Sequence, residues 1–171
     1  MITFGRYSDS FPLKVKTDYW NQSEKLFEEK KYLYSYKSFF DYLKNDDIKN
    51  VTYTLTPEEL QFQFYQGSRI IKGKADNNML VAEAKIAGFE KLSVALMRRI
   101  MEMNYTLYYS RFAINDNYIC VKFNTSVLDG SPRKVYYALK ELSTRADKQD
   151  DLLLEDFKNL NILDRTDVND F

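Results

Sequence analysis

The stretch MNYTLYYSRFAINDNYICVKF, residues 103–123, constrains the fold more than any other part of this sequence. Large apolar side chains alternate with others along it, the run Asn115-Asp116-Asn117 interrupts the pattern, and the alternation then resumes. A period of two on both sides of a turn predicts a β-hairpin with one face toward a core. We expect five side chains on that face: Phe112, Ile114, Ile119, Val121 and Phe123.

The opposite face of the predicted hairpin is the candidate binding surface. It carries Tyr105, Leu107, Tyr109 and Tyr118. Tyrosine is favoured in protein interfaces because its ring buries a large area while its hydroxyl stays polar. The same tyrosines also fit a second interpretation, in which they lie under a helix as core. The sequence leaves both interpretations open.

Three other segments have apolar residues at helical spacing, which predicts helices over 18–45, 90–104 and 131 to about 160. The third has the clearest beginning, because Ser131 is a good N-cap and Pro132 suits the first helical position. In the second, Met97, Met101 and Met103 fit either core packing or an adaptable binding surface.

Short strands are predicted between the first two helices, at 51–55, 60–65 and 69–75. The segment MLVAEAKI, residues 79–86, is ambiguous, because Ala and Glu favour a helix whereas the preceding turn and Gly88 favour a strand. The order is therefore α-βββ(β)-α-ββ-α. Its short turns predict an antiparallel sheet packed with helices, an α+β fold.

We expect one domain over 18–160, preceded by an N-terminal arm over 1–17 and followed by an acidic tail over 161–171. A chain of 171 residues can bury enough surface to fold without a disulfide or a structural metal.

Composition and segment patterns exclude several classes of protein. Lys+Arg and Asp+Glu are both 25, whereas nucleic-acid binders usually carry a basic excess, so no nucleic-acid partner is predicted. No apolar run approaches the length of a membrane span, and the N-terminus does not resemble a secretory signal. With a single cysteine, the chain fits a reducing compartment, and we predict a cytoplasmic protein.

The sequence offers little catalytic chemistry. It has no histidine and no phosphate-binding loop, and Cys120 falls inside a predicted strand, where a buried and unreactive thiol is expected. Asp147, Asp150 and Asp151 lie near one helical face and are the only support for a Mg²⁺ or Ca²⁺ site, which normally needs more oxygen ligands than one helix supplies. We therefore predict no enzymatic activity, no metal and no cofactor.

Residues 90–153 resemble the YbjN-like family, which shares its fold with the type III secretion chaperones. Three segments carry the resemblance: the helix LSVALMRRIMEMNY, which ends in Asn104, the hairpin SRFAINDNYICVKF, and the long helix SPRKVYYALKELSTRADKQDDLL. The resemblance implies a helix-sheet-helix sandwich that is often a homodimer and binds protein. In the secretion chaperones, a partially unfolded effector segment wraps the dimer. Those chaperones are typically acidic, whereas this chain has zero net charge.

Two functional hypotheses follow. The first is a non-enzymatic protein-binding domain, chaperone-like or regulatory, which acts as a homodimer and holds a segment of a partner protein, with strand addition at a sheet edge as one mode. The alternative is a metal-dependent module or enzyme that uses Asp and Glu chemistry. A third idea is an adaptor domain in a larger assembly.

Overall fold

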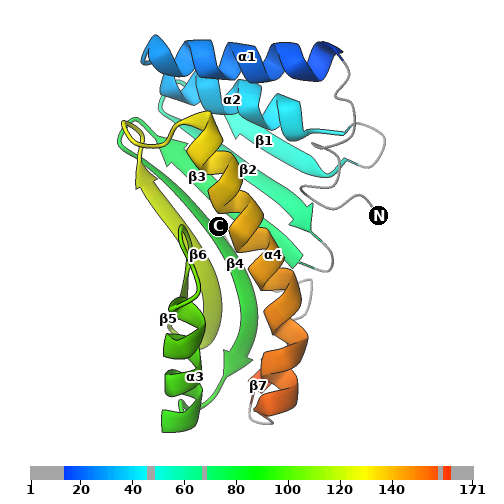
Figure 1. Cartoon of the computed structure of the whole chain (residues 1–171), viewed down its shortest axis with the longest axis vertical. Helices are drawn as coiled ribbons and strands as arrows, with labels where there is room; N and C mark the ends of the chain where they lie inside the picture. Colours follow the sequence, from blue (N-terminus) through cyan, green and yellow to red (C-terminus); the bar gives the residue numbers. More distant parts are fainter. Residues whose placement is uncertain (1–13, 46–48, 67–68, 158–159, 163–171) are drawn as a thin grey trace.

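The computed structural model describes residues 14–45, 49–66, 69–157 and 160–162. In this part of the chain, four helices and seven strands form an α+β fold with one antiparallel open sheet (Figure 1), as predicted. The helices are α1 (Lys14–Glu28), α2 (Tyr32–Leu43), α3 (Val94–Asn104) and α4 (Pro132–Asp156). The strands are β1 (Val51–Leu55), β2 (Glu59–Gln66), β3 (Arg69–Asp76), β4 (Met79–Phe89), β5 (Arg111–Asn115), β6 (Tyr118–Ser126) and β7 (Leu160–Ile162). The sheet order is β1-β2-β3-β4-β6-β5, and β7 pairs with β4.

The alternating pattern of the strands places the core on one face of the sheet. In β2, Phe62 and Phe64 are buried while Gln61 is exposed, which is the period of two predicted for this segment. Phe62 pairs with Gly73 of β3. A side-chain carbon at position 73 would overlap the Phe62 ring and the carbonyl oxygen of Val81, so only glycine fits under this ring.

Helices α2 and α4 cover this buried face, and α1 packs against both of them. Figure 1 shows α1 and α2 side by side at one end of the molecule and α4 running diagonally across the sheet. The Phe40 ring of α2 lies 4.3 Å from the Phe62 ring of β2, measured between centroids. The ring of Trp20 in α1 packs against that of Tyr136 in α4, with 6.0 Å between the ring centroids. Aromatic rings thus pack helix against helix as well as helix against sheet.

The prediction of a single helix over 18–45 is wrong, because the structure has two helices there, α1 and α2, separated by a turn at Lys30. Lys30 has a φ of 61°, its N–H bonds to the Phe27 carbonyl, and the next N–H bonds to the Leu26 carbonyl. This is a Schellman motif with lysine at the position where glycine is usual, so no glycine marks the end of α1 in the sequence. Helix–helix packing compensates for the unfavourable φ, since the buried Ser23 and Ser35 each donate a 2.8 Å hydrogen bond to the other's carbonyl.

The hairpin is confirmed, with a turn at Asp116, but its first strand is shorter than expected. Strand β5 begins at Arg111, and residues 105–110 form no strand. Four of the five predicted core side chains are buried: Phe112, Ile119, Val121 and Phe123. Ile114 is exposed instead, because it lies next to the turn on the outermost strand of the sheet.

Asn104 protects the outer edge of this sheet. Its Oδ1 accepts a hydrogen bond from the Phe112 N–H at 2.6 Å, and its Nδ2 donates to the Phe112 carbonyl at 3.0 Å. The side-chain amide thus satisfies the two peptide groups of β5 that an added strand would need at this position. Strand addition by a partner is consequently disfavoured at Phe112.

Both predicted domain boundaries fall inside regular structure. Helix α1 begins at Lys14, within the predicted arm, while residues 1–13 lie outside the described part of the chain. Helix α4 begins as predicted but ends at Asp156, and Leu160–Ile162 then forms β7. The ambiguous 79–86 segment is a strand, and β4 extends past β3 as far as Phe89, which leaves an edge for β7 to pair with. The rest of the predicted tail, 163–171, lies outside the described residues.

Candidate functional site

The segment 105–110 connects α3 to β5 and is attached to α4 by one carboxylate. Glu141 accepts hydrogen bonds from the backbone N–H groups of Tyr108 at 2.9 Å, Tyr109 at 3.0 Å and Ser110 at 2.8 Å. The Ser110 hydroxyl donates a fourth bond, at 2.7 Å. Successive N–H groups that converge on one anion form a nest, a concave anion site in the backbone. We call this arrangement the Glu141 clamp.

The clamp keeps Glu141 ionised. Partial burial alone would raise the pKa of this carboxyl, but the hydrogen bonds from Ser110, Tyr108 and Tyr109 outweigh burial and lower the pKa below its ordinary value. The negative charge of Glu141 is therefore directed at the backbone of the segment and is largely compensated there.

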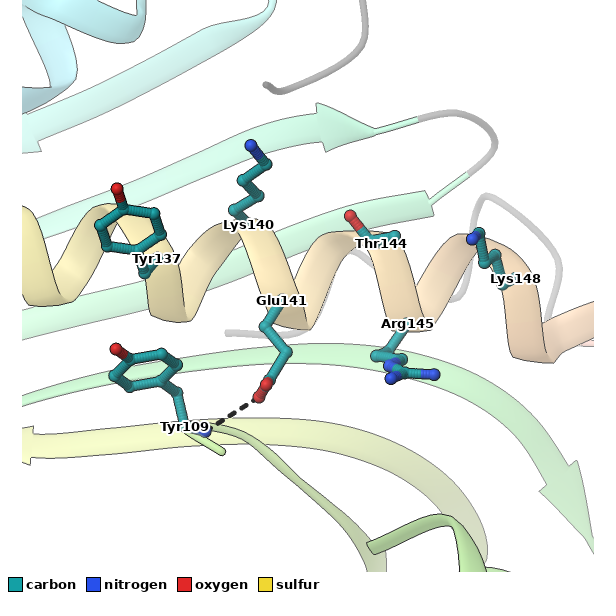
Figure 2. Close-up of a pocket in the computed structure, with 7 residues that line it drawn as sticks. All are labelled: Tyr109, Tyr137, Lys140, Glu141, Thr144, Arg145 and Lys148. Carbon is teal, nitrogen blue, oxygen red and sulfur yellow. Dashed lines mark hydrogen bonds between the residues drawn. The ribbon is translucent and has the colours of Figure 1, made fainter. Parts of the chain in front are cut away.

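Beside the clamp lies an open groove of about 370 Å³. Its lining residues are Tyr109, Tyr137, Lys140, Glu141, Thr144, Arg145 and Lys148 (Figure 2). All except Tyr109 belong to α4, where spacings of three and four place them along one side of the helix. The buried face of the same helix carries Val135, Leu139, Leu142 and Ala146. We call this feature the α4 groove.

The two ends of the α4 groove differ chemically. Figure 2 shows the rings of Tyr109 and Tyr137 together at one end, with Arg145 and Lys148 toward the other. Tyr109 is 42% exposed and Tyr137 is 50% exposed, so both rings offer apolar surface to a ligand. Lys140 lies between the two ends, with its Nζ 5.8 Å from the centroid of the Tyr136 ring.

The cations of the α4 groove have no acidic partners among the residues that the structure describes. Salt bridges there involve neither Lys140, Arg145 nor Lys148. The described lining has three cations and one carboxylate, Glu141, so its net charge is positive, and the clamp directs that carboxylate at the backbone of 108–110. Aromatic surface at one end and cations along the rest suit an elongated ligand that has apolar and negatively charged groups.

The four residues predicted to form the binding surface do not share one face. Tyr105 is 94% exposed, Leu107 is half-buried against the core, and Tyr109 lines the α4 groove. The prediction that 105–110 belongs to the first strand of the hairpin is wrong. The backbone N–H groups that a strand would use for pairing are hydrogen-bonded to Glu141 instead.

Tyr118, the fourth predicted residue, belongs to a polar network on the sheet. Its hydroxyl donates to Glu83 at 2.9 Å, and Lys122 forms a 2.8 Å salt bridge with the same carboxylate. The Lys85 ammonium lies 4.6 Å from the centroid of the Tyr118 ring. Burial and the bond to Glu83 raise the pKa of Tyr118 to about 12, so the hydroxyl stays protonated and links β4 to β6.

The cysteine and the helix carboxylates were considered in the sequence as sources of chemistry. Cys120 is buried, as expected, and burial raises the pKa of its thiol to about 12. The residues described contain no cluster of three or more potential metal ligands. The side chains of Asp150 and Asp151 are not among them, so the metal hypothesis at these positions stays untested.

Helix α3 carries a second exposed feature. Met103 is buried, whereas Met97 and Met101 are exposed and continue a row of apolar side chains along the helix. This row, which we call the α3 stripe, consists of Val94, Met97, Met101 and Tyr105. Their spacings of three, four and four place them on one side of the helix.

The sequence contains a row of residues that corresponds to the α4 groove, but their helical spacing alone does not identify them as a binding site. Positions 137, 140, 141, 144 and 148 repeat at helical spacing opposite the apolar stripe, with lysine at two of them. Such a row usually marks a solvated helix face. Only the tertiary fold shows that the segment 105–110 lies beside it and makes a groove.

In the described part of the chain, no helix has both the length and the apolar character needed to cross a membrane. No family model matches the sequence, and no curated protein matches it significantly.

Proposed function

We propose that this protein is a non-enzymatic protein-binding domain of the cytoplasm, chaperone-like or regulatory, that holds a partner segment in the α4 groove. The observation that carries the proposal is the groove itself, in which Tyr109 of the 105–110 segment lies beside one tyrosine and three cations of α4, and none of the three cations forms a salt bridge with the residues that the structure describes. Tyrosine and arginine are among the residue types that contribute most to binding energy in protein interfaces.

The dimensions of the α4 groove suit a short extended segment. Tyr137 and Lys148 are eleven residues apart, which corresponds to about 16 Å along a helix. An extended chain advances about 3.3 Å per residue, so the groove matches about five residues of a partner. The Glu141 clamp forms part of the wall, so such a segment would meet a largely preformed surface.

Position-specific cross-linking tests this proposal. The photoreactive residue p-benzoylphenylalanine would replace Tyr109 or Tyr137, and the full-length protein would be irradiated in lysate of the source organism. We expect both variants to form the same discrete cross-linked product, identifiable by mass spectrometry, because both side chains line one groove.

The matched control is the same replacement at Tyr65. Its side chain is 46% exposed, close to the 42% of Tyr109, but it lies on β2 outside the groove. A product that also forms from position 65, or the absence of any product from positions 109 and 137, would contradict binding in the α4 groove.

We further propose that the protein acts as a homodimer related to the secretion-chaperone type. The order of α3, the β5–β6 hairpin and α4 is compatible with that fold. The α3 stripe supplies an apolar surface suited to self-association: Met101 is 72% exposed and Tyr105 is nearly fully exposed. A second copy would bury these side chains.

Light scattering coupled to size-exclusion chromatography measures the molar mass of the protein in solution and so tests the proposed homodimer. We expect a mass of twice the 20.3 kDa of one chain for the wild type, and a single-chain mass for Met101→Glu, because a charge in the α3 stripe would remain desolvated and unpaired in the dimer. Tyr34→Glu is the control, since Tyr34 is exposed on α2, away from the stripe. A wild type with the mass of one chain would refute the dimer.

A further inference from the structure

We infer that the segment bound in the α4 groove is acidic, with an apolar or aromatic residue at one end that packs on Tyr109 and Tyr137. This inference rests on the proposed function and adds the chemistry of the partner. It follows from the charge of the lining, from the position of the tyrosines, and from the hydrogen bonds by which the clamp occupies Glu141, the one carboxylate among the described lining residues.

Charge complementarity identifies the sign of the partner. Lys140, Arg145 and Lys148 contribute three positive charges, and the described residues supply none of them with a salt bridge. A basic segment would meet uncompensated like charges, whereas carboxylates would find donors along the whole groove. Arg145 also offers the planar fork of donors that pairs with a carboxylate through two parallel bonds.

Glu141 does not cancel this preference. Its carboxylate accepts three backbone N–H groups and the Ser110 hydroxyl at 2.7–3.0 Å. A carboxylate with four donors has little capacity left for a lysine of the lining or of a partner. Asp147 belongs to the same helix but does not line the groove. The clamp thus shapes the wall without making the groove acidic.

The arrangement of the groove also gives the ligand a direction. The tyrosine rings lie together at one end, and Arg145 and Lys148 lie toward the other (Figure 2). A segment of about five extended residues would place its apolar residue on the rings and its carboxylates along the cations. Small anions would use only the basic end.

Fluorescence anisotropy with a designed probe tests the inference. The probe is a fluorescein-labelled peptide with one phenylalanine followed by a run of glutamates, and the comparison peptide has glutamine in place of every glutamate. We expect the glutamate peptide to bind the full-length protein and to dissociate as salt is raised, because exposed charges are screened. The glutamine peptide should bind at least about tenfold more weakly, because surface ion pairs are worth up to about 1 kcal/mol each.

Two double variants locate the binding. Arg145→Glu with Lys148→Glu should weaken binding of the glutamate peptide by about tenfold or more. Lys25→Glu with Lys74→Glu changes the net charge equally at exposed residues outside the groove and should leave affinity within about twofold of the wild type. Equal losses in both double variants would overturn the inference, because net charge alone would then explain binding.

Three other outcomes would also overturn it. Equal affinity for the two peptides would remove the charge preference. Displacement of the peptide by inorganic phosphate at a similar concentration would indicate a site for small anions. A cross-linked partner whose captured segment is neutral or basic would leave the proposed function standing while refuting the acidic ligand, so the two proposals can fail separately.

Discussion

Replacing Glu141 with alanine should destabilise the protein by about 2–3 kcal/mol. The change removes the acceptor of four hydrogen bonds, three of them from backbone N–H groups of 108–110. Removing a charged acceptor from buried donors lowers the free energy of unfolding more than removing a neutral one. Water can reach part of this site and replaces some of the lost hydrogen bonds. The measurement is urea unfolding at pH 7. Glu155→Ala is the control on the same helix, where an exposed side chain should change stability by less than about 0.5 kcal/mol.

The Glu141 clamp should also make stability depend on pH. Because its pKa is lowered in the folded state, the carboxylate stabilises the protein above the ordinary value of 4.5, and this contribution disappears as the pH falls through the lowered pKa. The difference in unfolding free energy between wild type and Glu141→Gln should therefore be full at pH 7 and should shrink below pH 4.5. A difference that stays constant on acidification would show that the charge of Glu141 is not what holds the segment 105–110.

Replacing Phe40 with alanine should cost more, about 3–5 kcal/mol. Its ring is fully buried between Phe39, at 5.2 Å, and Phe62, at 4.3 Å, so truncation leaves a cavity where α2 packs on the sheet. Tyr34→Ala, at an exposed position of the same helix, isolates the effect of burial and should cost less than about 0.5 kcal/mol beyond helix propensity. Similar losses for both, measured by urea unfolding, would contradict the packing described here.

Residues with local signals were predicted correctly. Phe62 and Phe64 alternate with glutamines, and their segment is a strand with those rings buried. Ser131 and Pro132 mark the beginning of α4, where the Ser131 hydroxyl accepts the Lys134 N–H. Each of these signals is complete within a few neighbouring residues, so no knowledge of distant contacts was needed.

The candidate site was predicted only in part. Tyr109 was singled out and does line the α4 groove, but Tyr105, Leu107 and Tyr118 lie elsewhere. The prediction extended the hairpin through 105–110 because the alternation of side chains continues there. It could not include the carboxylate of Glu141, more than thirty residues further along the chain, which holds those peptide groups away from a strand.

The sequence by itself determined the α+β class, the antiparallel hairpin and the strands β1, β2 and β3, since turn residues, side-chain periodicity and helix caps act over a few neighbouring positions, whereas it left the β4 segment ambiguous. Tertiary structure decided the break at Lys30, the pairing of β7 with β4 and the shape of the α4 groove. Each depends on groups that meet only after folding: Ser23 with Ser35, Leu160 with Phe89, and Glu141 with the backbone of 108–110. Such contacts override the local preference for a helix or strand, because a buried backbone N–H or C=O group must be hydrogen-bonded and tertiary packing determines which partner is close enough.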